Sequence, residues 1–592
     1  MGTVTDADLL SELEMFGVDD VKTECMSKMK ELCLTYGCDA EQFSCDWIAF
    51  TSRKSVGPSD ITLQLLEDME REDLSQKRVK PEMHTPVTQK FVPVVFTAKD
   101  ENIEDCDMAD DVLESYGVRS ELLRKRQLTP DRRVAKRIMD SSGSPSVVFS
   151  PASFSPKNLT PSEKYTARTC SGDVVAHMRQ RDSIAWKCRS TEEVCTQLLQ
   201  PGSVATKNVL YMFEQNLDKA GALNAMAADY ADMYREHLGG EQFVNIKSAF
   251  QESSFVTGRV YCDSLGKMNS TSLILEGSDT SFGNWVPLNV SNLKQYSFFS
   301  GQVIIGKGTN PTGQMLVLEE LLEGKLPPFP TSPPLFKEPL QIVIACGPYT
   351  TTDDLSFQPL TDFTNYIMEH KPQVCIMAGP FVDCKNELIQ KGNLPESYNT
   401  MFQKQVQTLS SVLAQTKTKV VLIPSQRDVH HDFVYPTPPF RLDETYKNVL
   451  CAPDPCILDI DGFIVGVTAV DVLFHLGKEE ISPPGASDRL SRLARHVLSQ
   501  HCFYPLYPAS EDVGLDCNLL EDSGRFSTTP HLLVLPSDLR CFVKDIQGCI
   551  CVNPERITKG IVGGTFARVH VAPVCSYEGS MAQSISVEVL KI

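Results

Sequence analysis

Aspartate and histidine side chains stand at the ends of apolar runs in the C-terminal half of this 592-residue chain. The apolar run 420–424 leads into the sequence Asp-Val-His-His-Asp at 428–432, and Asp383 and Asp538 follow two other such runs. Carboxylate and imidazole groups are common ligands of divalent metal ions, and two such ions side by side promote phosphoester hydrolysis. Metal-assisted phosphoester hydrolysis is therefore the chemistry that these residue types could support.

Four segments share one form, a β-rich apolar run that ends in a turn of small residues. They are IVIACGPYT (342–350), VCIMAGPFVDC (374–384), VVLIPSQRDVHHD (420–432) and HLLVLPSDLRC (531–541). Junctions of this kind are where an open α/β sheet presents its functional groups. The order of these four junctions resembles that in the calcineurin-like phosphoesterases. Those enzymes carry Asp-x-His, Gly-Asp-x-x-Asp, Gly-Asn-His-Asp/Glu and Gly-His-x-His at the four corresponding turns.

The four turns of this chain depart from that pattern. Cysteine, glycine and proline occupy the first turn, proline replaces the bridging aspartate in the second, arginine replaces a histidine in the third, and the fourth has no histidine. The residues of these degenerate turns are Cys346, Pro348, Pro380, Asp383, Arg427, Asp428 and Asp538. The resemblance thus implies an inactive phosphodiesterase domain with no catalytic residue, no metal and no cofactor.

Longer motifs carry a more specific resemblance. They are ACGPYTTTDDLSFQPL (345–360), MAGPFVDCKN (377–386), PSQRDVHHDFVYPTPPF (424–440) and FVKDIQGCICVNPERITKGIVGGTFARVHV (542–571). With these motifs, nearly the whole chain resembles the small (B) subunits of replicative DNA polymerases. The resemblance implies an N-terminal helical domain, a flexible linker, an OB domain and a catalytically dead phosphodiesterase domain.

The same resemblance implies a non-catalytic accessory subunit. It would bind the C-terminal, zinc-bearing domain of the polymerase catalytic subunit through the OB and phosphodiesterase domains together. The small and large primase subunits would complete a nuclear complex that supports initiation of DNA replication and RNA–DNA primer synthesis. Replication-initiation factors would bind the N-terminal helices, and DNA would be contacted mainly indirectly.

Composition limits the alternatives. An apolar fraction of 42% allows packed domains, and 592 residues predict about three or four of them. No run of about 18 uncharged apolar residues offers a membrane span, and the acidic N-terminus does not fit a secretory signal. The net charge of −20 argues against a protein that grips duplex DNA by its own surface. The 20 cysteines lie scattered, many within apolar runs, which favours reduced core thiols.

Residues 1–75 have the spacing of four short helices. Thr5 or Asp6 begins the first, Asp20 the second, Asp39 the third and the sequence Pro-Ser-Asp at 58–60 the fourth. These helices predict a small bundle whose acidic faces either dock partners or only solvate the bundle.

Residues 76–165 lose this periodicity and are rich in Pro, Ser, Thr and charge, so we expect a disordered linker. The segment carries proline-directed phosphorylation candidates, of which Thr129, with Arg132 three residues on, best fits a cyclin-dependent kinase. The candidates are Thr129, Ser144, Ser150, Ser155 and Thr160. A two-part basic cluster favours nuclear import, with a solvated linker or weak nucleic-acid contact as the alternatives. Its residues are Arg124, Lys125, Arg126, Arg132, Arg133, Lys136 and Arg137.

The rest of the chain divides into a β-rich part, 166–335, and an α/β part, 336–592. Short strands separated by Gly, Asn and Ser turns at 254–262, 272–275, 286–290 and 301–305 favour a five-stranded OB barrel. A proline-rich passage then leads to strands that alternate with helices, including 359–370 and 398–415. The result is a multidomain α+β and α/β chain.

Two other functions compete with the scaffold. An active metallophosphoesterase would use Asp383, the 428–432 segment and Asp538, but Arg427 would place a fixed positive charge among the metal ions. A single-stranded DNA-binding OB module would need aromatic and basic residues together on one face, and basic residues are sparse there. Core and interface roles for the barrel aromatics are the preferred interpretation.

Overall fold

The computed structural model describes residues 6–70 and 163–592, with short gaps inside these ranges. The gaps are 15–17, 19–20, 37–38, 55–60, 180–183, 185, 189–192, 200–201, 207–209, 236–237, 239–240, 265, 279–280, 282, 335, 393, 484–487 and 575–579. Residues 76–162 of the predicted linker, with its phosphorylation candidates and basic cluster, therefore lie outside the described residues, whereas its last residues belong to the short helix α7 (Glu163–Thr166), where Tyr165 is buried.

Four helices form the N-terminal part: α1 (Asp6–Glu14), α2 (Thr23–Tyr36), α3 (Ala40–Lys54) and α4 (Leu63–Met69). Their apolar positions recur at helical spacing, so each helix has one face to bury. Met29, Phe43, Trp47 and Leu66 are fully buried in one cluster of these helices. Thr62 caps α4 by accepting a hydrogen bond from the backbone N–H of Leu65.

A closed five-stranded barrel follows, in the order β3-β4-β5-β7-β6. Its strands are β3 (Phe250–Cys262), β4 (Leu273–Gly277), β5 (Trp285–Asn289), β6 (Val303–Asn310) and β7 (Leu316–Leu321). The predicted barrel and the strands proposed for it are confirmed. Gly258 lies where β3 approaches β4 closely, since a Cβ atom there would stand 2.3 Å from the backbone oxygen of Glu276.

The C-terminal part consists of two mixed sheets. One has the order β1-β20-β19-β8-β9-β10-β11, and the other has the order β15-β16-β14-β13-β12-β2. The first contains β1 (Val174–Met178), β8 (Leu340–Cys346), β9 (Val374–Ala378), β10 (Lys419–Ile423), β11 (Val449–Cys451), β19 (Thr565–Val571) and β20 (Ile585–Lys591). The second contains β2 (Thr196–Leu198), β12 (Cys456–Ile460), β13 (Phe463–Val467), β14 (Leu532–Val534), β15 (Phe542–Ile546) and β16 (Cys549–Asn553).

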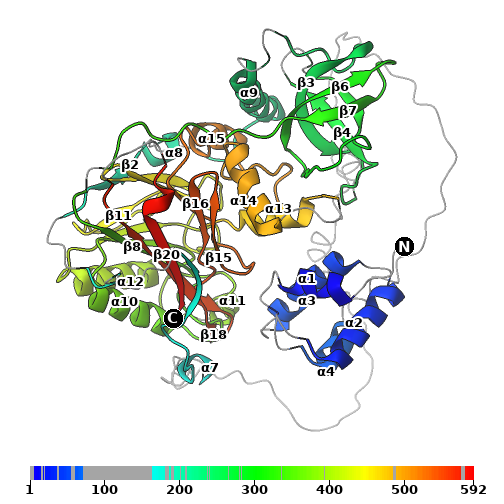
Figure 1. Cartoon of the computed structure of the whole chain (residues 1–592). Helices are drawn as coiled ribbons and strands as arrows, with labels where there is room; N and C mark the ends of the chain where they lie inside the picture. Colours follow the sequence, from blue (N-terminus) through cyan, green and yellow to red (C-terminus); the bar gives the residue numbers. More distant parts are fainter. Residues whose placement is uncertain are drawn as a thin grey trace, which may run out of the picture. The chain divides into compact units, whose positions relative to one another are not determined.

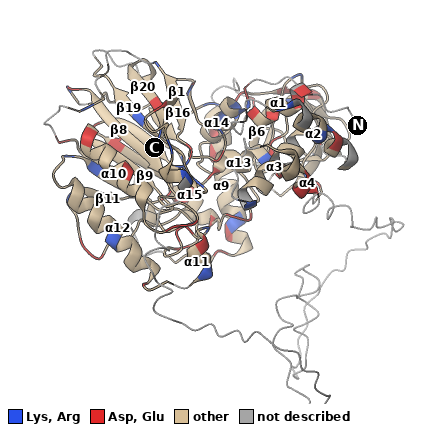
Figure 2. Cartoon of the chain, turned by 90° about the horizontal axis from the view of Figure 1, so that it is seen from below, with Lys and Arg blue, Asp and Glu red and all other residues tan. Residues whose placement is uncertain are grey.

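Each sheet is buried on both faces, which explains why its central strands read as continuous apolar runs. On β8, Ile342 and Ile344 join the core shared with the second sheet, whereas Val343 and Ala345 join the core under the helices. Figure 1 shows α10 (Gln358–His370) and α12 (Tyr398–Leu413) side by side over the outer face of the first sheet, and both helices were predicted. Figure 2 shows charged residues on α11 (Glu387–Lys391) and α12, while β8 and β9 carry none.

The sheets differ from the sequence analysis in two ways. The fourth junction follows β14, which belongs to the second sheet, whereas the first three follow neighbouring strands of the first sheet. In addition, β1 pairs with β20 and β2 pairs with β12, so residues near 174–198 belong to the sheets and not to the barrel domain. Both are edge strands contributed from far away in the sequence, and short-range patterns do not reveal such partners.

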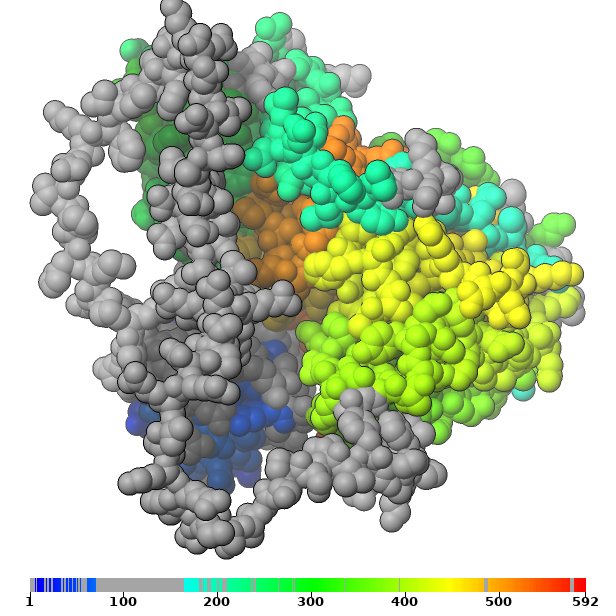
Figure 3. Space-filling view, turned by 180° about the vertical axis from the view of Figure 1, so that it is seen from behind, coloured from blue at the N-terminus to red at the C-terminus, as the bar shows by residue number. Residues whose placement is uncertain are grey.

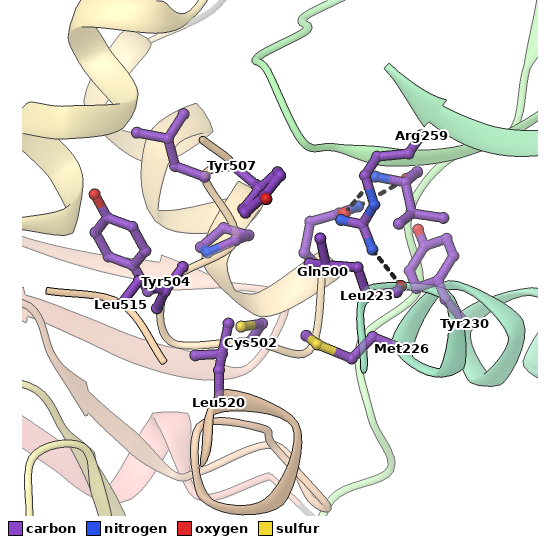
Figure 4. A pocket seen from close by; sticks show the side chains of 13 residues that line it. Leu223, Met226, Tyr230, Arg259, Gln500, Cys502, Tyr504, Tyr507, Leu515 and Leu520 are labelled. Atoms are coloured by element: carbon purple, nitrogen blue, oxygen red, sulfur yellow. Dashed lines mark hydrogen bonds between the residues drawn. The ribbon is translucent and has the colours of Figure 1, made fainter. Parts of the chain in front are cut away.

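The barrel and the two-sheet part share a junction built from α9 (Asn216–Arg235), the barrel and the segment 500–520. Arg259 of β3 donates a hydrogen bond to the carbonyl oxygen of Leu223 at 2.7 Å (Figure 4) and another to that of Gly301 at 2.6 Å. The side-chain amide of Gln500 bonds both the N–H and the C=O of Val303, at 2.8 and 2.9 Å. The Arg259 bonds join β3 to α9 and to the turn at Gly301, whereas the Gln500 bonds cross from the two-sheet part to the barrel and hold the two parts together.

Glycine at position 301 is required by this junction. Gly301 has a φ of +93°, and a Cβ atom there would lie 2.5 Å from the backbone nitrogen of Tyr507. The Tyr507 N–H donates to the carbonyl of Ser300, whose hydroxyl donates to the carbonyl of Tyr507.

None of the helices in the described ranges has both the length and the apolar character of a membrane span.

Candidate functional site at the strand ends

The first three turns meet at one edge of the first sheet because β8, β9 and β10 are parallel neighbours. Two glycines let the turns pack against one another without a side chain between them. A Cβ atom on Gly347 would lie 2.1 Å from the carbonyl oxygen of Pro380, and one on Gly379 would lie 2.3 Å from Asp428 Oδ2. Cys346, Pro348 and Pro380 of the degenerate turns are therefore buried in this contact.

Asp428 holds the second and third turns together. Its Oδ1 accepts hydrogen bonds from the N–H groups of Phe381 and Val382 at 2.6 and 3.0 Å, and its Oδ2 accepts one from its own turn, the Ser425 N–H, at 3.0 Å. Burial raises the pKa of Asp428 to about 7, although its three backbone donors favour the ionised form. A buried carboxylate whose two oxygens accept three backbone bonds is committed to holding these turns and is poorly placed to bind a metal.

Arg427 pairs with Asp383, the other carboxylate of these turns. Arg427 Nε lies 3.1 Å from Asp383 Oδ1, and a guanidinium NH₂ group bonds Asp383 Oδ2, so the contact is bidentate. Burial works against the charged guanidinium, but Asp383 more than offsets it and raises the pKa of Arg427 above its usual value. Asp383 is only 2% exposed, so this pair neutralises a carboxylate that water cannot reach.

A second arginine, Arg556, lies among the remaining carboxylates. Its Nε is 3.3 Å from Asp538 Oδ1, and its side chain is 3.9 Å from Asp471 Oδ2. Asp471 also caps α13 (Val472–Glu479) through the Phe474 N–H, and its Oδ2 accepts the Asp538 N–H at 2.7 Å. Burial and then the neighbouring Asp538 raise the pKa of Asp471 to about 6.

Asp538 joins the two arginines electrostatically. Its side chain is 57% exposed, so burial opposes its charge only in part, and Arg556 and then Arg427 hold the pKa of Asp538 below its usual value. The cluster therefore contains two permanent cations facing Asp383, Asp471 and Asp538. Among the described residues, no group of three or more His, Cys, Asp and Glu side chains is arranged to hold a metal ion.

The two histidines of the third turn face away from these carboxylates. His430 stacks against Phe402 and Phe440, with ring centroids 4.4 and 5.5 Å away, and burial lowers its pKa to about 4. His431 Nε2 lies 2.7 Å from the carbonyl oxygen of Pro438. Both imidazoles are thus packing groups of the loop that follows β10.

Asp454 is a buried carboxylate that the sequence analysis did not single out. It is 0% exposed, and its Oδ1 accepts hydrogen bonds from the Thr468 hydroxyl and the Ala469 N–H, both at 2.8 Å. Its Oδ2 has no hydrogen-bond partner among the described residues, and burial raises the pKa of Asp454 to about 7. A proton on Oδ2 is the physical means of keeping this group neutral.

Sequence reasoning brought Asp383, Arg427, Asp428 and Asp538 to one place and missed Arg556, Asp471 and Asp454. The available signal for Arg556 was its position directly after the apolar strand β16, inside the motif 542–571. Arg556 therefore follows a fifth strand end, in addition to the four turns considered from the sequence.

Comparisons with known proteins follow the same division of the chain. Residues 7–76 match a family described as the N-terminal domain of DNA polymerase alpha B subunits, and residues 222–324 match the OB domain of the same B subunits. Residues 342–544 match a family described as the B subunits of DNA polymerases alpha and epsilon. Together these matches define the class as the B subunits of replicative DNA polymerases.

Comparison with full-length relatives identifies the family within this class. The chain is 37% identical over 96% of its length to the B subunit of mouse DNA polymerase alpha, of which it covers 96%. It is 30% identical over 99% of its length to the DNA polymerase alpha B subunit of Drosophila melanogaster, of which it covers 100%. It is 28% identical to the Saccharomyces cerevisiae protein of that name, over 63% of this chain and 62% of that protein. The chain belongs to the family of DNA polymerase alpha B subunits. It is therefore an accessory polymerase subunit.

The arginine pairing can be tested by stability. Changing Arg427→Met leaves Asp383 buried without a cation, and we expect a loss of about 3–5 kcal/mol in the unfolding free energy of the C-terminal part. The double variant Arg427→Met/Asp383→Asn should recover most of this loss. Lys391→Met is the matched control, because its ion pair with Glu387 is exposed and is expected to contribute less than about 1 kcal/mol. Calorimetric unfolding of the full chain measures all four proteins, and equal stability of the Arg427 variant and the control would refute the pairing.

The raised pKa of Asp454 predicts that the unfolding free energy of the chain depends on pH. Its carboxyl keeps a proton in the folded chain up to pH about 7, whereas in the unfolded chain it ionises near its ordinary value of 3.8. Stability from this group is therefore present at low pH and falls as pH rises from about 4 to 7. Asp454→Asn removes the titration, so its stability relative to the unmodified chain should rise over that window by on the order of 3 kcal/mol. Asp353→Asn, at an exposed site, is the control, and parallel pH profiles for Asp454→Asn and the unmodified chain would show this account to be wrong.

Proposed function

We propose that this chain is a non-catalytic scaffold that binds the C-terminal, zinc-bearing domain of the polymerase catalytic subunit through its barrel and two-sheet parts. The observation that carries the proposal is the position of Arg427 and Arg556. Their guanidinium groups lie among the carboxylates at the strand ends, where a phosphoesterase of similar order would hold its metal ions. We interpret the two-sheet part as an inactive calcineurin-like phosphodiesterase domain.

Permanent cations oppose hydrolysis in two ways. A catalytic metal needs an open coordination position, whereas Asp428 and Asp383 have their oxygens committed to backbone donors and to Arg427. A second positive charge a few ångströms away also raises the free energy of a bound divalent ion. The residues present do not fit a two-metal site, and we infer that the chain is not an enzyme.

The junction between the barrel and the two-sheet part supports the scaffold role. Besides Arg259 and Gln500, it contains a buried ion-pair cluster in which Glu480 accepts from Arg492 at 2.6 Å. The hydroxyl of Ser297, from the barrel side, bonds Glu480 at 2.5 Å. Burial opposes the charge of Glu480, but His496 and Arg492 hold its pKa well below the usual range. A partner would therefore meet one surface made by both parts.

Direct binding of single-stranded DNA by the barrel is the weaker alternative. Phe255, Phe298 and Phe299 are buried, and Tyr261 packs against Tyr507 of the two-sheet part. Trp285 is 57% exposed, beside Lys247. Stacking platforms for single strands need several such aromatics along a basic groove. The buried positions of Phe255, Phe298 and Phe299 support core use of these aromatics, and Tyr261 contributes to the junction within the chain.

We further propose that the subunit acts in the nucleus, in a complex with the small and large primase subunits that supports initiation of DNA replication and RNA–DNA primer synthesis. The basic cluster from Arg124 to Arg137 would support import, and phosphorylation at Thr129 and the later sites would change partner access. The N-terminal helices would dock replication-initiation factors, with DNA contacted mainly indirectly.

Co-purification tests the main proposal. The full chain and a chain lacking residues 1–160 are each co-expressed with the C-terminal domain of the catalytic subunit. We expect both to retain it with similar affinity, because the barrel and sheets have buried cores of their own. Residues 1–78 alone serve as the control and should not retain it. Binding by the full chain but not by a folded shortened chain would place the interface elsewhere.

A further inference from the structure

Exposed apolar side chains gather on the segment that leads into α9. Leu210, Phe213 and Leu217 are 75%, 76% and 81% exposed, the highest values for large apolar residues in the described ranges. Met212 on the same segment is 51% exposed, and Phe433 on the loop after β10 is 57% exposed. We refer to these five residues as the Leu210–Leu217 patch.

The segment that carries the patch is anchored. The Met212 N–H donates to Asp516 Oδ2 at 2.9 Å. Glu214, whose side chain is 2% exposed, accepts from the N–H groups of Cys517 and Asn518 at 2.8 and 3.2 Å, at the start of α15 (Cys517–Ser523). Lys219 pairs with the other oxygen of Glu214 at 3.3 Å. The apolar side chains are thus held outward by a fixed backbone.

Packing beneath the patch joins its two segments. Tyr211 is half-buried against Val434 and Leu519, which brings the segment 210–217 to the residue after Phe433. The Phe433 ring covers Gly514, where a Cβ atom would lie 3.1 Å from the ring. Figure 3 shows the teal surface around the start of α9 against yellow and orange surface, the colours of residues near 450 and 500. Through Tyr211 and Val434, the segment 210–217 and the loop of Phe433 therefore lie next to each other.

The charges around the patch are mostly acidic. Asp432 is exposed beside Phe433 and acts on Tyr211, and Asp218 lies in the first turn of α9. Asp512 is exposed on the segment that passes under Phe433. Arg441 offsets one of these charges near Tyr211. Such a rim repels nucleic-acid phosphates, and two copies facing each other here would bring acid against acid. The surface therefore fits a different protein, with apolar side chains at its centre and Lys or Arg at its edge.

The patch also lies where a partner could span both parts of the chain. The later residues of α9, including Tyr230 and Tyr234, pack against Phe255 and Ile305 of the barrel. Its beginning lies over α15 of the two-sheet part. We propose that the Leu210–Leu217 patch is the docking surface for an apolar, basic-rimmed segment of the catalytic subunit's C-terminal domain. This inference rests on the proposed function and assigns the surface that performs it.

The test uses the purified full chain and the C-terminal domain of the catalytic subunit in a surface binding assay. Phe213→Ser/Leu217→Ser is expected to weaken binding about 30-fold or more, because truncating central apolar anchors has large effects. Since both side chains are exposed, the melting temperature should not change. Val412→Ser is the matched control, because this exposed apolar residue lies on α12, and it should bind within about twofold of the unmodified chain.

The rim gives a second variant that does not alter apolar packing. Asp432→Lys should slow association and reduce its dependence on salt, because rim charges mainly act on encounter. Unchanged binding by both the patch and rim variants, with the unmodified chain binding tightly, would overturn the patch assignment. No binding by the unmodified chain would instead refute the proposed function. A dimer of this chain, or binding of a labelled single strand, that the double serine variant abolishes would assign the patch to those occupants and also overturn the proposal.

Discussion

Carboxylates buried at the strand ends must be neutralised, and in this chain arginine does so. Asp383 is 2% exposed and pairs with Arg427, and the largely buried Asp471 faces Arg556, which also pairs with the exposed Asp538. Burying a carboxylate without a partner costs several kcal/mol, so the loop that carries Asp383 depends on Arg427. In a two-metal hydrolase the same demand is met by the ions themselves. A guanidinium group neutralises the carboxylates permanently, but the guanidinium offers no coordination position and no activated water.

Neutralisation by arginine in place of metal ions has consequences for the loops. An open metal site needs access for water and substrate, and its ligands must be free of other bonds. Here Asp428 joins two turns through three backbone donors, and His430 is stacked against two phenylalanine rings that also contact each other. The loops are therefore closed and rigid, and they can serve as foundation for contact surface. One of these loops contributes to the Leu210–Leu217 patch, since Phe433 lies two residues after His431.

Much of the fold could be predicted from the sequence because its elements carry strong local signals. Four of the five barrel strands, the helices near 358–370 and 398–413 and the four strand-end turns occur where the patterns indicate them, whereas β7 was not indicated. Edge strands β1 and β2 could not be assigned, because their partners β20 and β12 are hundreds of residues away. The same limit applies to the site. Arg427 attracted notice because it stands where a histidine is expected, whereas only tertiary contacts reveal that Arg556 pairs with Asp538 and that Asp454 is buried.

Metal binding by the unmodified chain shows directly whether arginine, and not a metal ion, neutralises the carboxylates at the strand ends. Equilibrium dialysis of the full-length, metal-stripped chain against increasing Mn²⁺ measures how many ions it holds. Because Arg427 and Arg556 already balance the carboxylates, the account predicts no saturable binding at micromolar Mn²⁺ and no change in melting temperature. Saturation at one or two ions per chain, lost in Asp383→Asn and Asp428→Asn, would contradict it.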